Sequence, residues 1–419
     1  MNTEKTKLLI VSHDMNIGGV ERSLISLLEA LDYNRYDVDL FLYSHAGDFL
    51  PMLPPQVCLL PENKKYQAVS GPLKEAIRGG RFRIAFGKLQ ARFRFHRAWK
   101  KGRIPLGGDA GFYSVQCLRE CTSGALPEIP GEYDAAISFV WPHHCVADRV
   151  RAKRKLAWIH TDYSGTYLDY KKDERVWSRF DRIVAVSEEC RKSFAGLYPH
   201  LADRLCVVEN LLDPGFVRRQ AELQDVSREI PREEGVTNIV SVGRLSYPKG
   251  FDEAIRACRL LLDRGYRIRW YVVGYGEKEK PLRTLIEKKH VEGAFFLLGK
   301  KLNPYPYMKA CDIYAQPSRY EGKAVTVREA QILARPVLIT NFGTAGSQVE
   351  NGADGYITPL GPEGIADGIA YLIDHPEVCR SLSECAAGRD YGNRGEIKKL
   401  YAYLDKKQTG GCHETDKSL

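Results

Sequence analysis

The chain of 419 residues lacks any long uninterrupted apolar run. Its first apolar stretch, residues 8–11, is too short for a secretory signal core or for a membrane span, and no other segment approaches 18 apolar residues. Eleven cysteines are present, but they do not form the paired spacings of a zinc site. We therefore expect a cytoplasmic protein that does not cross a bilayer and whose cysteines are mostly buried, reduced thiols.

Acidic residues are nearly absent from one segment, residues 74–103. This segment contains eleven lysines and arginines and a single acid, Glu75. Its formal charge of +10 exceeds the +9 of the whole chain, so the remaining residues sum to about −1. The basicity is local and predicts a local anionic partner.

The same segment has the periodicity of an amphipathic helix. Phe82, Phe86, Leu89 and Phe93 recur at spacings of four, three and four residues, which places them on one face. The basic residues Lys88, Arg92, Arg94, Arg97, Lys100 and Lys101 flank or continue this stripe. The pattern is typical of an interfacial membrane anchor. Two alternatives are a helix packed on its own domain and a single-stranded nucleic-acid site, although the rest of the chain has no basic excess for the latter.

Two segments open in the same way, with a strand, a loop and a helix. The first has a strand at 7–12, a loop at 13–19 and a helix from 20 to 31, and the second has them at 238–243, 244–250 and 251–262. Further apolar strands are predicted at 38–43, 135–140, 155–159, 183–186, 206–208, 269–273, 294–298, 312–315 and 337–340. Helical patterns alternate with them, which predicts an α/β fold of two Rossmann-like, doubly wound domains. We place the first domain at 1–212, a polar linker at 213–235 and the second domain at 236–394, followed by a helix and a polar tail at 395–419.

The most informative motif is a pair of carboxylates eight residues apart, Glu321 and Glu329. An apolar strand precedes them and an apolar helical pattern follows, so Glu321 is expected on a strand-to-helix loop and Glu329 in the first turns of the helix. Open α/β sheets bind phosphorylated ligands at such loops. A carboxylate can accept two hydrogen bonds from a sugar diol.

This segment resembles the E-x7-E motif of retaining family 4 glycosyltransferases with the GT-B fold. The continuation at 335–340, Gly343 and 350–355 strengthens the likeness, which covers most of residues 236–375. The resemblance implies two domains facing a cleft, with a final helix at about 395–407 returning to the first domain. It also implies that Glu329 holds the ribose of a nucleotide-sugar and that Glu321 holds the hydroxyls of the donor sugar.

Two cations on the second strand-to-helix loop, Arg244 and Lys249, are spaced to reach one anion at a helix N-terminus. In the resembled family these residues hold the donor diphosphate as it leaves. We therefore expect neither a metal nor any other cofactor. The D-x-D pattern at Asp37 and Asp39 resembles a metal signature of other nucleotide-sugar enzymes, but it begins a strand of the first domain, away from the expected donor loops.

Five glycines match backbone positions near the donor in the resembled family. Gly18 and Gly19 lie on the first loop, where the absence of Cβ atoms lets backbone approach a ligand. Gly274 follows the strand at 269–273, Gly299 is expected beside the base, and Gly322 follows Glu321. Each of these glycines could equally be an ordinary turn residue.

Polar residues at strand ends of the first domain complete the candidate site. His160 ends one strand and is the preferred histidine near the reacting sugar, while His143 and His144 end another and compete for that role. A histidine satisfied by backbone groups is the structural alternative in each case. Ser187 and Asn210 match family positions that face the cleft, as possible donor or acceptor contacts.

The sequence thus predicts a retaining, metal-independent glycosyltransferase. Its donor is a nucleotide-diphosphate sugar, for which we favour a UDP-linked one, and its acceptor is a glycan or lipid-linked glycan of surface polysaccharide, including capsule. The basic segment predicts a peripheral location on the inner face of the plasma membrane. Open alternatives are a GT-B nucleotide-sugar epimerase or hydrolase, a catalytically idle sugar-nucleotide-binding subunit, and a nucleic-acid-binding protein.

Overall fold

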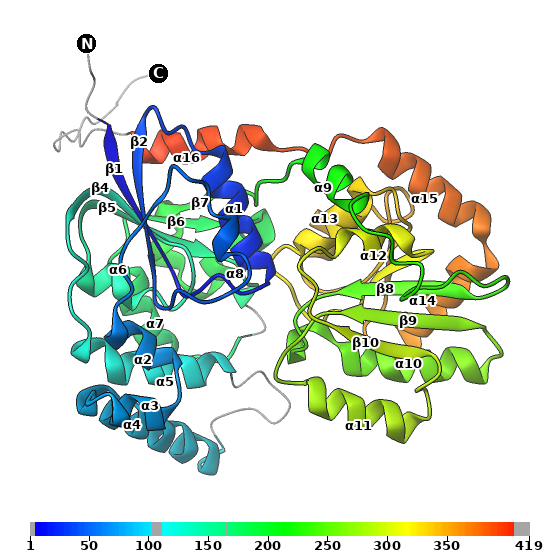
Figure 1. Cartoon of the computed structure of the whole chain (residues 1–419), viewed down its shortest axis with the longest axis horizontal. Coiled ribbons are helices and arrows are strands. Elements are labelled where there is room, and N and C mark those ends of the chain that lie inside the picture. The colour runs from blue at the N-terminus through cyan, green and yellow to red at the C-terminus, as the bar shows by residue number, and fades with distance from the viewer. Residues whose placement is uncertain (1–4, 103–110, 164–165, 406–419) are drawn as a thin grey trace.

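Two parallel β-sheets, one in each half of the chain, organise the structure (Figure 1). The computed structural model describes residues 5–102, 111–163 and 166–405. The first sheet has the order β3-β2-β1-β4-β5-β6-β7, and the second has the order β10-β9-β8-β11-β12-β13. Every strand pair is parallel. The predicted α/β fold of two Rossmann-like domains is therefore confirmed.

The strands of the first sheet are β1 (Thr6–Ser12), β2 (Tyr36–Leu42), β3 (Cys58–Leu59), β4 (Glu132–Ser138), β5 (Arg151–Ile159), β6 (Arg182–Ala185) and β7 (Leu205–Val207). Those of the second are β8 (Thr237–Val242), β9 (Ile268–Val273), β10 (Phe295–Gly299), β11 (Ile313–Gln316), β12 (Val337–Thr340) and β13 (Tyr356–Thr358). The predicted strands all exist, while the short edge strands β3 and β13 were missed.

The central strands are apolar because helices cover both faces of each sheet. Leu8, Leu9 and Ile10 of β1 have no exposed surface between β2 and β4. Such continuous burial is typical of parallel sheets, whose crossover helices pack on either side. Since all strands in a sheet run the same way, their carboxyl ends share one edge, and the loops that follow β1 and β8 meet between the domains.

Helices of the first domain are α1 (Gly19–Ala30), α2 (Lys64–Ser70), α3 (Leu73–Arg78), α4 (Phe82–Lys100), α5 (Gly111–Thr122), α6 (His144–Arg149), α7 (Tyr170–Trp177) and α8 (Glu188–Leu197). Helices α2 to α5 form one insertion between β3 and β4, and they lie together at one end of this domain (Figure 1). The basic segment 74–103 falls on α3 and α4, apart from Arg103, which lies outside the described residues.

Helices of the second domain are α10 (Phe251–Asp263), α11 (Glu279–Lys289), α12 (Tyr305–Ala310), α13 (Val325–Ile332), α14 (Pro362–Asp374) and α15 (Pro376–Gly388). The segment 213–235, predicted as a polar linker, contains α9 (Pro214–Ala221). Val217, Ala221, Val226 and Ile230 of this segment are buried in the core of the second domain. These apolar side chains are spaced among charged residues, which made the segment read as polar.

The chain crosses back to the first domain at its end, as predicted. Helix α16 (Ile397–Leu404) buries Ile397, Leu400 and Leu404 in the core of the first domain. The hydroxyl of Tyr401 donates to the carbonyl of Ala30 at 3.2 Å and accepts from the amide of Asp32 at 2.8 Å. Figure 1 shows α16 lying along the first domain. The part of the predicted tail from residue 406 on lies outside the described residues.

Candidate active site

The loop after β8 and the loop after β11 are locked together at Gly250. This residue caps α10 with a φ of +65°, and a Cβ atom there would collide with the carbonyl oxygen of Pro317. Only glycine combines that left-handed backbone with so close an approach. The amide of Arg319 also donates to the carbonyl of Pro248 at 2.7 Å. The two motif-bearing loops are therefore held against each other before any ligand arrives.

This packing brings Lys249 against Glu321. The ammonium Nζ of Lys249 lies 2.5 Å from Oε1 of Glu321. The same oxygen accepts from Oγ of Ser318 at 2.7 Å, and it lies 3.4 Å from Nε2 of Gln316. Both side chains are largely shielded from solvent, with exposures of 20% and 12%. A donor phosphate and a sugar hydroxyl bound here would thus meet a preformed cation and carboxylate.

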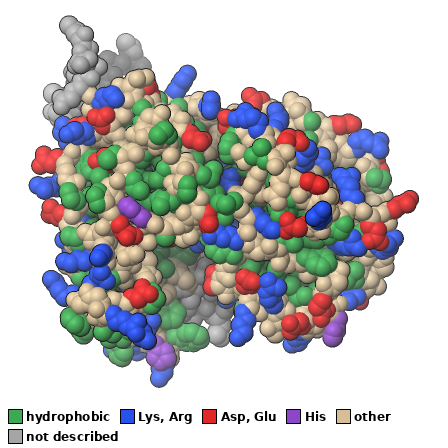
Figure 2. Space-filling view, viewed as in Figure 1, with side chains coloured by type: hydrophobic (Ala, Val, Ile, Leu, Met, Phe, Trp, Pro, Cys, Tyr) green, Lys and Arg blue, Asp and Glu red, His purple; other side chains and the backbone are tan. Residues whose placement is uncertain are grey.

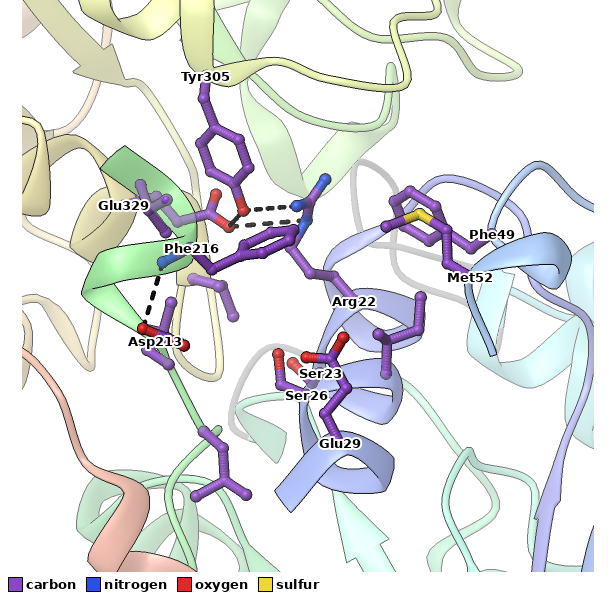
Figure 3. A pocket seen from close by; sticks show the side chains of 15 residues that line it. Arg22, Ser23, Ser26, Glu29, Phe49, Met52, Asp213, Phe216, Tyr305 and Glu329 are labelled. Atoms are coloured by element: carbon purple, nitrogen blue, oxygen red, sulfur yellow. Dashed lines mark hydrogen bonds and ion pairs between the residues drawn. The ribbon is translucent and has the colours of Figure 1, made fainter. Parts of the chain in front are cut away.

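Glu329 is fully buried on α13 and contacts the first domain. Its Oε1 accepts from the hydroxyl of Tyr305 at 2.7 Å and lies 3.6 Å from Nε of Arg22 on α1. Its other oxygen, Oε2, is buried without a hydrogen-bond partner. Figure 3 shows Arg22 and Tyr305 converging on Glu329 at one end of a pocket between the domains, which Phe49 and Phe216 also line.

Arg244 faces the first loop across the domain interface. Its guanidinium Nη2 lies 4.0 Å from Oε1 of Glu21, the third residue of α1. The Glu21 carboxylate folds back over Gly18, where a Cβ atom would collide with it. Burial raises the pKa of Glu21 to about 7, and the positive charge of Arg244 opposes that rise. The missing Cβ of Gly18 therefore leaves space for the Glu21 carboxylate, which lies opposite Arg244. A Cβ at Gly19 would contact no other atom.

The other three predicted glycines differ in how closely their backbone packs against neighbouring atoms. A Cβ at Gly274 would collide with the carbonyl oxygen of Gly243, and one at Gly322 would collide with that of His160 in the first domain. Gly299 has a φ of +73° and open space around it. The structure thus explains Gly274 and Gly322 by backbone packing, and Gly322 marks a point where the two domains touch.

The three predicted histidines occupy different environments. His143 is fully buried, its Nδ1 lies 2.8 Å from Oγ of Ser138, and its ring packs edge-on against Trp177. This is the environment of a core histidine. His144 and His160 are partly exposed at the carboxyl edge of the first sheet, and burial lowers the pKa of each to about 4. Both imidazoles are therefore neutral near pH 7.

Ser187 and Asn210 lie at the domain junction. The hydroxyl of Ser187 caps α8 by accepting from the amide of Cys190, and it lies 3.3 Å from the carbonyl oxygen of Gly322. Asn210 accepts through its backbone carbonyl from Nδ2 of Asn393 at 2.9 Å, where the chain crosses between the domains. Ser187 therefore contacts the loop that carries Glu321. Asn210 instead contacts Asn393, where the chain crosses between the domains.

Sequence reasoning missed the charged residues that pair across the interface. Arg22 and Glu21 contact the second domain, and Lys323 places its ammonium 2.5 Å from Oε2 of Glu209. Lys300 likewise pairs with Asp48. Glu21 and Arg22 directly follow the Gly18-Gly19 loop, which was the one available signal. Their partners lie hundreds of residues away and could not be found by spacing.

The D-x-D pattern falls on β2, in the half of the strand away from the carboxyl edge. Asp37 lies 3.6 Å from the ammonium of Lys5, and Asp39 accepts from the hydroxyl of Tyr133 at 3.0 Å. Across the described ranges, no group of three or more His, Cys, Asp or Glu residues is placed to hold a metal ion. The two aspartates are thus engaged elsewhere than at the loops that carry Arg244 and Lys249.

The apolar stripe of α4 points to solvent. Phe82, Phe86 and Phe93 are 68%, 61% and 66% exposed, and Leu89 and Trp99 are also exposed. The opposite face, with Ile84, Ala85 and Ala91, packs on the domain. The helix therefore does pack on its own domain, as in the structural alternative, but through this opposite face, and the apolar stripe stays exposed. Figure 2 shows hydrophobic and basic side chains side by side at the end of the molecule where α3 and α4 lie.

One predicted member of the basic flank was placed on the wrong face. Lys88 is buried, and its ammonium donates to the carbonyl of Gly71 between α2 and α3. A lysine in the middle of an aromatic and basic run gives no sign that its head group satisfies a backbone carbonyl. No helix in the ranges that the structure describes combines the length and apolar character needed to cross a membrane.

Comparison with known proteins finds a family match in the second domain. Residues 224–389 match the family described as "Glycosyl transferases group 1". The amylovoran biosynthesis glycosyltransferase AmsK of Erwinia amylovora is 32% identical over 32% of this chain and 34% of its own length. The putative colanic acid biosynthesis glycosyltransferase WcaL of Salmonella typhimurium is 34% identical over 29% of this chain and 32% of its own. The chain thus spans about a third of the length of each of these relatives.

Among solved structures, the fold is similar over nearly the whole chain to Alr3699/HepE of Anabaena, crystallised with UDP and glucose. The TM-score is 0.68 at 16% identity, and the alignment covers 95% of this chain and 98% of that one. The group 1 match covers residues 224–389, and the structural likeness shows that the whole chain has the GT-B fold.

Proposed function

We propose that this protein is a retaining glycosyltransferase that takes its sugar from a nucleotide-diphosphate donor. The observation that carries the proposal is the contact between Lys249 and Glu321. A cation suited to phosphate and a carboxylate suited to sugar hydroxyls thereby meet on the loops that follow the neighbouring strands β8 and β11, and Arg244 lies on the first of these loops. The structure of HepE in complex with UDP and glucose supports UDP as the carrier.

Each residue has a distinct role in the proposal. Arg244 and Lys249 bind the diphosphate, Glu321 accepts hydrogen bonds from sugar hydroxyls, and Glu329 accepts from the ribose through its unpartnered oxygen. His160 lies on the facing edge of the first domain as a neutral imidazole that can donate to the sugar or phosphate. Catalysis then rests on positioning and on charge stabilisation at the leaving group.

The reaction requires no enzyme nucleophile. Glu321 forms an ion pair with Lys249 and accepts a hydrogen bond from Ser318, so we do not assign it the role of nucleophile. In the proposed front-face reaction, the bond from the anomeric carbon to the diphosphate oxygen breaks, and the acceptor oxygen bonds to the same face. The acceptor proton passes to the departing phosphate. The negative charge that grows on the diphosphate is neutralised by the two cations, so no divalent ion is needed.

The acceptor belongs, in this proposal, to a surface polysaccharide such as a capsule. The names of AmsK and WcaL connect similar sequences to polysaccharide biosynthesis. Helix α4 presents exposed aromatic side chains beside exposed Arg92, Arg97 and Lys100. An exposed apolar stripe with a basic border suits an anionic lipid surface. We therefore place the enzyme on the inner face of the plasma membrane, acting on a glycan or a lipid-linked glycan.

The test is a panel of nucleotide-sugars screened by thermal shift, followed by turnover with the best donor and membrane extract as acceptor. We expect a UDP-sugar to stabilise the protein, and the product to keep the anomeric configuration of the donor in its NMR spectrum. An inverted product would refute the retaining mechanism. Release of free nucleotide or an epimerised donor without any acceptor would favour the epimerase or hydrolase.

A further inference from the structure

A buried arginine of the first domain has no anionic partner among residues 5–102, 111–163 and 166–405. Arg119 on α5 is 5% exposed, and its Nε and Nη1 atoms are buried without a hydrogen-bond acceptor. Its guanidinium stacks on the ring of Tyr43 at 4.4 Å. Its one recorded hydrogen bond runs from Nη2 to Nε2 of His13 at 3.4 Å, which is long for such a bond. A guanidinium has five donors, so most of its capacity is unused.

Among the residues that the structure describes, no carboxylate balances the charge of Arg119. The groups that act on it electrostatically are Tyr43, Tyr66 and Cys145, all of which are neutral near pH 7. No ion pair joins it to an acid in the part of the chain that the structure describes. Burying an uncompensated charge is costly, and proteins rarely retain such a group without a use for it.

The position of Arg119 connects it to the crevice. His13 directly follows β1, Tyr43 directly follows β2, and His144 begins α6 after β4. All three therefore stand at the carboxyl edge of the first sheet. Arg119 contacts His13 and Tyr43 from the helical insertion beside it, and its charge also acts on His144. The loop that starts at His13 also carries Gly18, which faces Arg244. Through His13, Arg119 thus contacts the same first-domain loop that faces Arg244 across the domain interface.

We propose that Arg119, with His13 and His144, binds an anionic group of the acceptor. The inference rests on the proposed function and adds the chemical class of the acceptor, which carries a phosphate or a carboxylate. A bound anion would replace the His13 nitrogen as hydrogen-bond acceptor, and the open Nδ1 of His144 adds a second polar contact. The donor diphosphate is not this anion, because its cations, Arg244 and Lys249, belong to the other domain.

Two sources could supply such an anion, the diphosphate of a lipid carrier or the carboxylate of an acidic sugar. Both are tested by calorimetric titration of the protein saturated with UDP. The probes are inorganic diphosphate and methyl β-D-glucuronide, with methyl β-D-glucoside as the neutral counterpart. We expect one anionic probe to bind and the glucoside not to bind. Binding of neither anion, or equal binding of the glucoside, would overturn the proposal.

The variants separate binding from folding. Arg119→Met should lower affinity for the anionic probe at least ten-fold, while Arg119→Lys should retain part of it. Arg151→Gln removes an exposed arginine at the start of β5 and should change nothing. Because the charge of Arg119 is unbalanced, Arg119→Met should melt at the same temperature as the parent protein or higher. Unchanged anion affinity in this variant, or failure of it to fold, would show that Arg119 is structural.

Failure of this proposal can be told from failure of the proposed function. Binding of UDP is measured in the first step of each titration, and its absence would refute the donor assignment alone. The anion titration is then repeated without UDP on the parent protein and on Arg119→Met. Diphosphate binding that the variant keeps belongs to Arg244 and Lys249, and binding that it loses belongs to Arg119.

Discussion

The Nε atom of Arg22 lies 3.6 Å from Oε1 of Glu329, so a buried ion pair joins the first helix of one domain to the donor helix of the other. Tyr305 closes the same group through its hydrogen bond to Glu329. A ribose can reach this carboxylate at its unpartnered oxygen Oε2, or at Oε1 by displacing Tyr305 or Arg22. The carboxylate proposed for nucleotide binding therefore also joins the two domains. Variants of Glu329 should weaken both nucleotide binding and the contact between the domains.

Glu329→Ala should weaken nucleotide binding, and Glu321→Ala should lower turnover more than nucleotide affinity. A hydrogen bond to a charged group contributes roughly 1.5–3 kcal/mol, which corresponds to about one to two decades. Calorimetry with UDP and steady-state kinetics measure the two effects. Near-normal values for both variants would refute the assigned roles.

Arg244→Ala and Lys249→Ala should each remove most of the transfer activity through kcat. Both cations are proposed to act on charge that grows as the diphosphate leaves, so the transition state loses more than the ground state. Turnover measured with EDTA should match turnover without it. A strict requirement for Mg²⁺ or Mn²⁺ would show that Arg244 and Lys249 alone do not neutralise the diphosphate. Asp37 and Asp39 would then be candidate metal ligands.

Reversing the exposed charges of α4 should release the protein from anionic membranes. Each cation near such a surface contributes about 1 kcal/mol, so the triple variant Arg92→Glu, Arg97→Glu, Lys100→Glu should lose about a hundred-fold or more in binding. Arg94 is left unchanged because it lies 3.4 Å from Glu120. Sedimentation with liposomes of varied anionic content measures the effect.

The matched control for this experiment changes three exposed lysines elsewhere, Lys280, Lys288 and Lys398, to glutamate. It alters the net charge equally and should leave vesicle binding almost intact. Equal binding of the parent protein to neutral and anionic vesicles would contradict the anchor. Tight, salt-resistant binding to single-stranded RNA would support the nucleic-acid alternative instead.

Gly250→Ala should lower both stability and activity, because the new Cβ would force apart the loops that carry Lys249 and Glu321. Gly265→Ala is the control, since Gly265 has a φ of +87° but no atom near its Cβ position. Both variants should lose about 1–2 kcal/mol to the left-handed backbone. Only Gly250→Ala should lose more in urea unfolding and also lose turnover, so equal losses would refute the locked-loop interpretation.

Buried titratable groups at the interface predict opposite pH trends. The pKa values of His144 and His160, about 4, lie below their ordinary value of 6.5, so their contribution to stability is complete above pH 6.5 and is lost as the pH falls toward 4. The pKa of Glu21, about 7, lies above its ordinary value of 4.5, so its contribution is complete below pH 4.5 and is lost as the pH rises to 7.

Variants resolve these two trends in urea unfolding between pH 4 and 8. His160→Gln should flatten the acid side of the stability profile. Glu21→Gln should gain up to about 3 kcal/mol relative to the parent protein at pH 8, with no gain at pH 4. Parallel profiles for all three proteins would contradict the pKa shifts.

The fold was predictable because its signals are local. Uninterrupted apolar runs such as residues 8–11 mark strands buried on both faces, and the two strand–loop–helix openings mark the two domains. The two-residue strand β3 gave no such signal, since a segment so short has no periodicity. The helix in 213–235 was hidden because its buried side chains, such as Val217 and Ile230, stand among charged residues.

The candidate site was only half predictable. Glu321, Lys249 and Arg244 could be found because each belongs to a loop motif, whereas Arg22 and Lys323 belong to no motif and are defined by partners distant in the sequence. Arg119 sits among ordinary helical residues and offers no pattern at all. Such residues are defined by contacts across the whole chain, and spacing within one segment cannot reveal them.

The return of α16 to the first domain makes the second domain an insertion within the first. The polypeptide passes between the domains twice, once near Leu212 and once near Asn393, and the amide of Leu212 donates to Oδ1 of Asn393 at 2.9 Å. Two adjacent crossings act as a double-stranded hinge, which permits rotation about one axis more readily than twisting. Proteolytic cleavage at one crossing would leave the halves tethered by the other. Deletion of α16 should destabilise the first domain, because Ile397, Leu400 and Leu404 are part of its core. This holds although α16 follows the second domain in the chain.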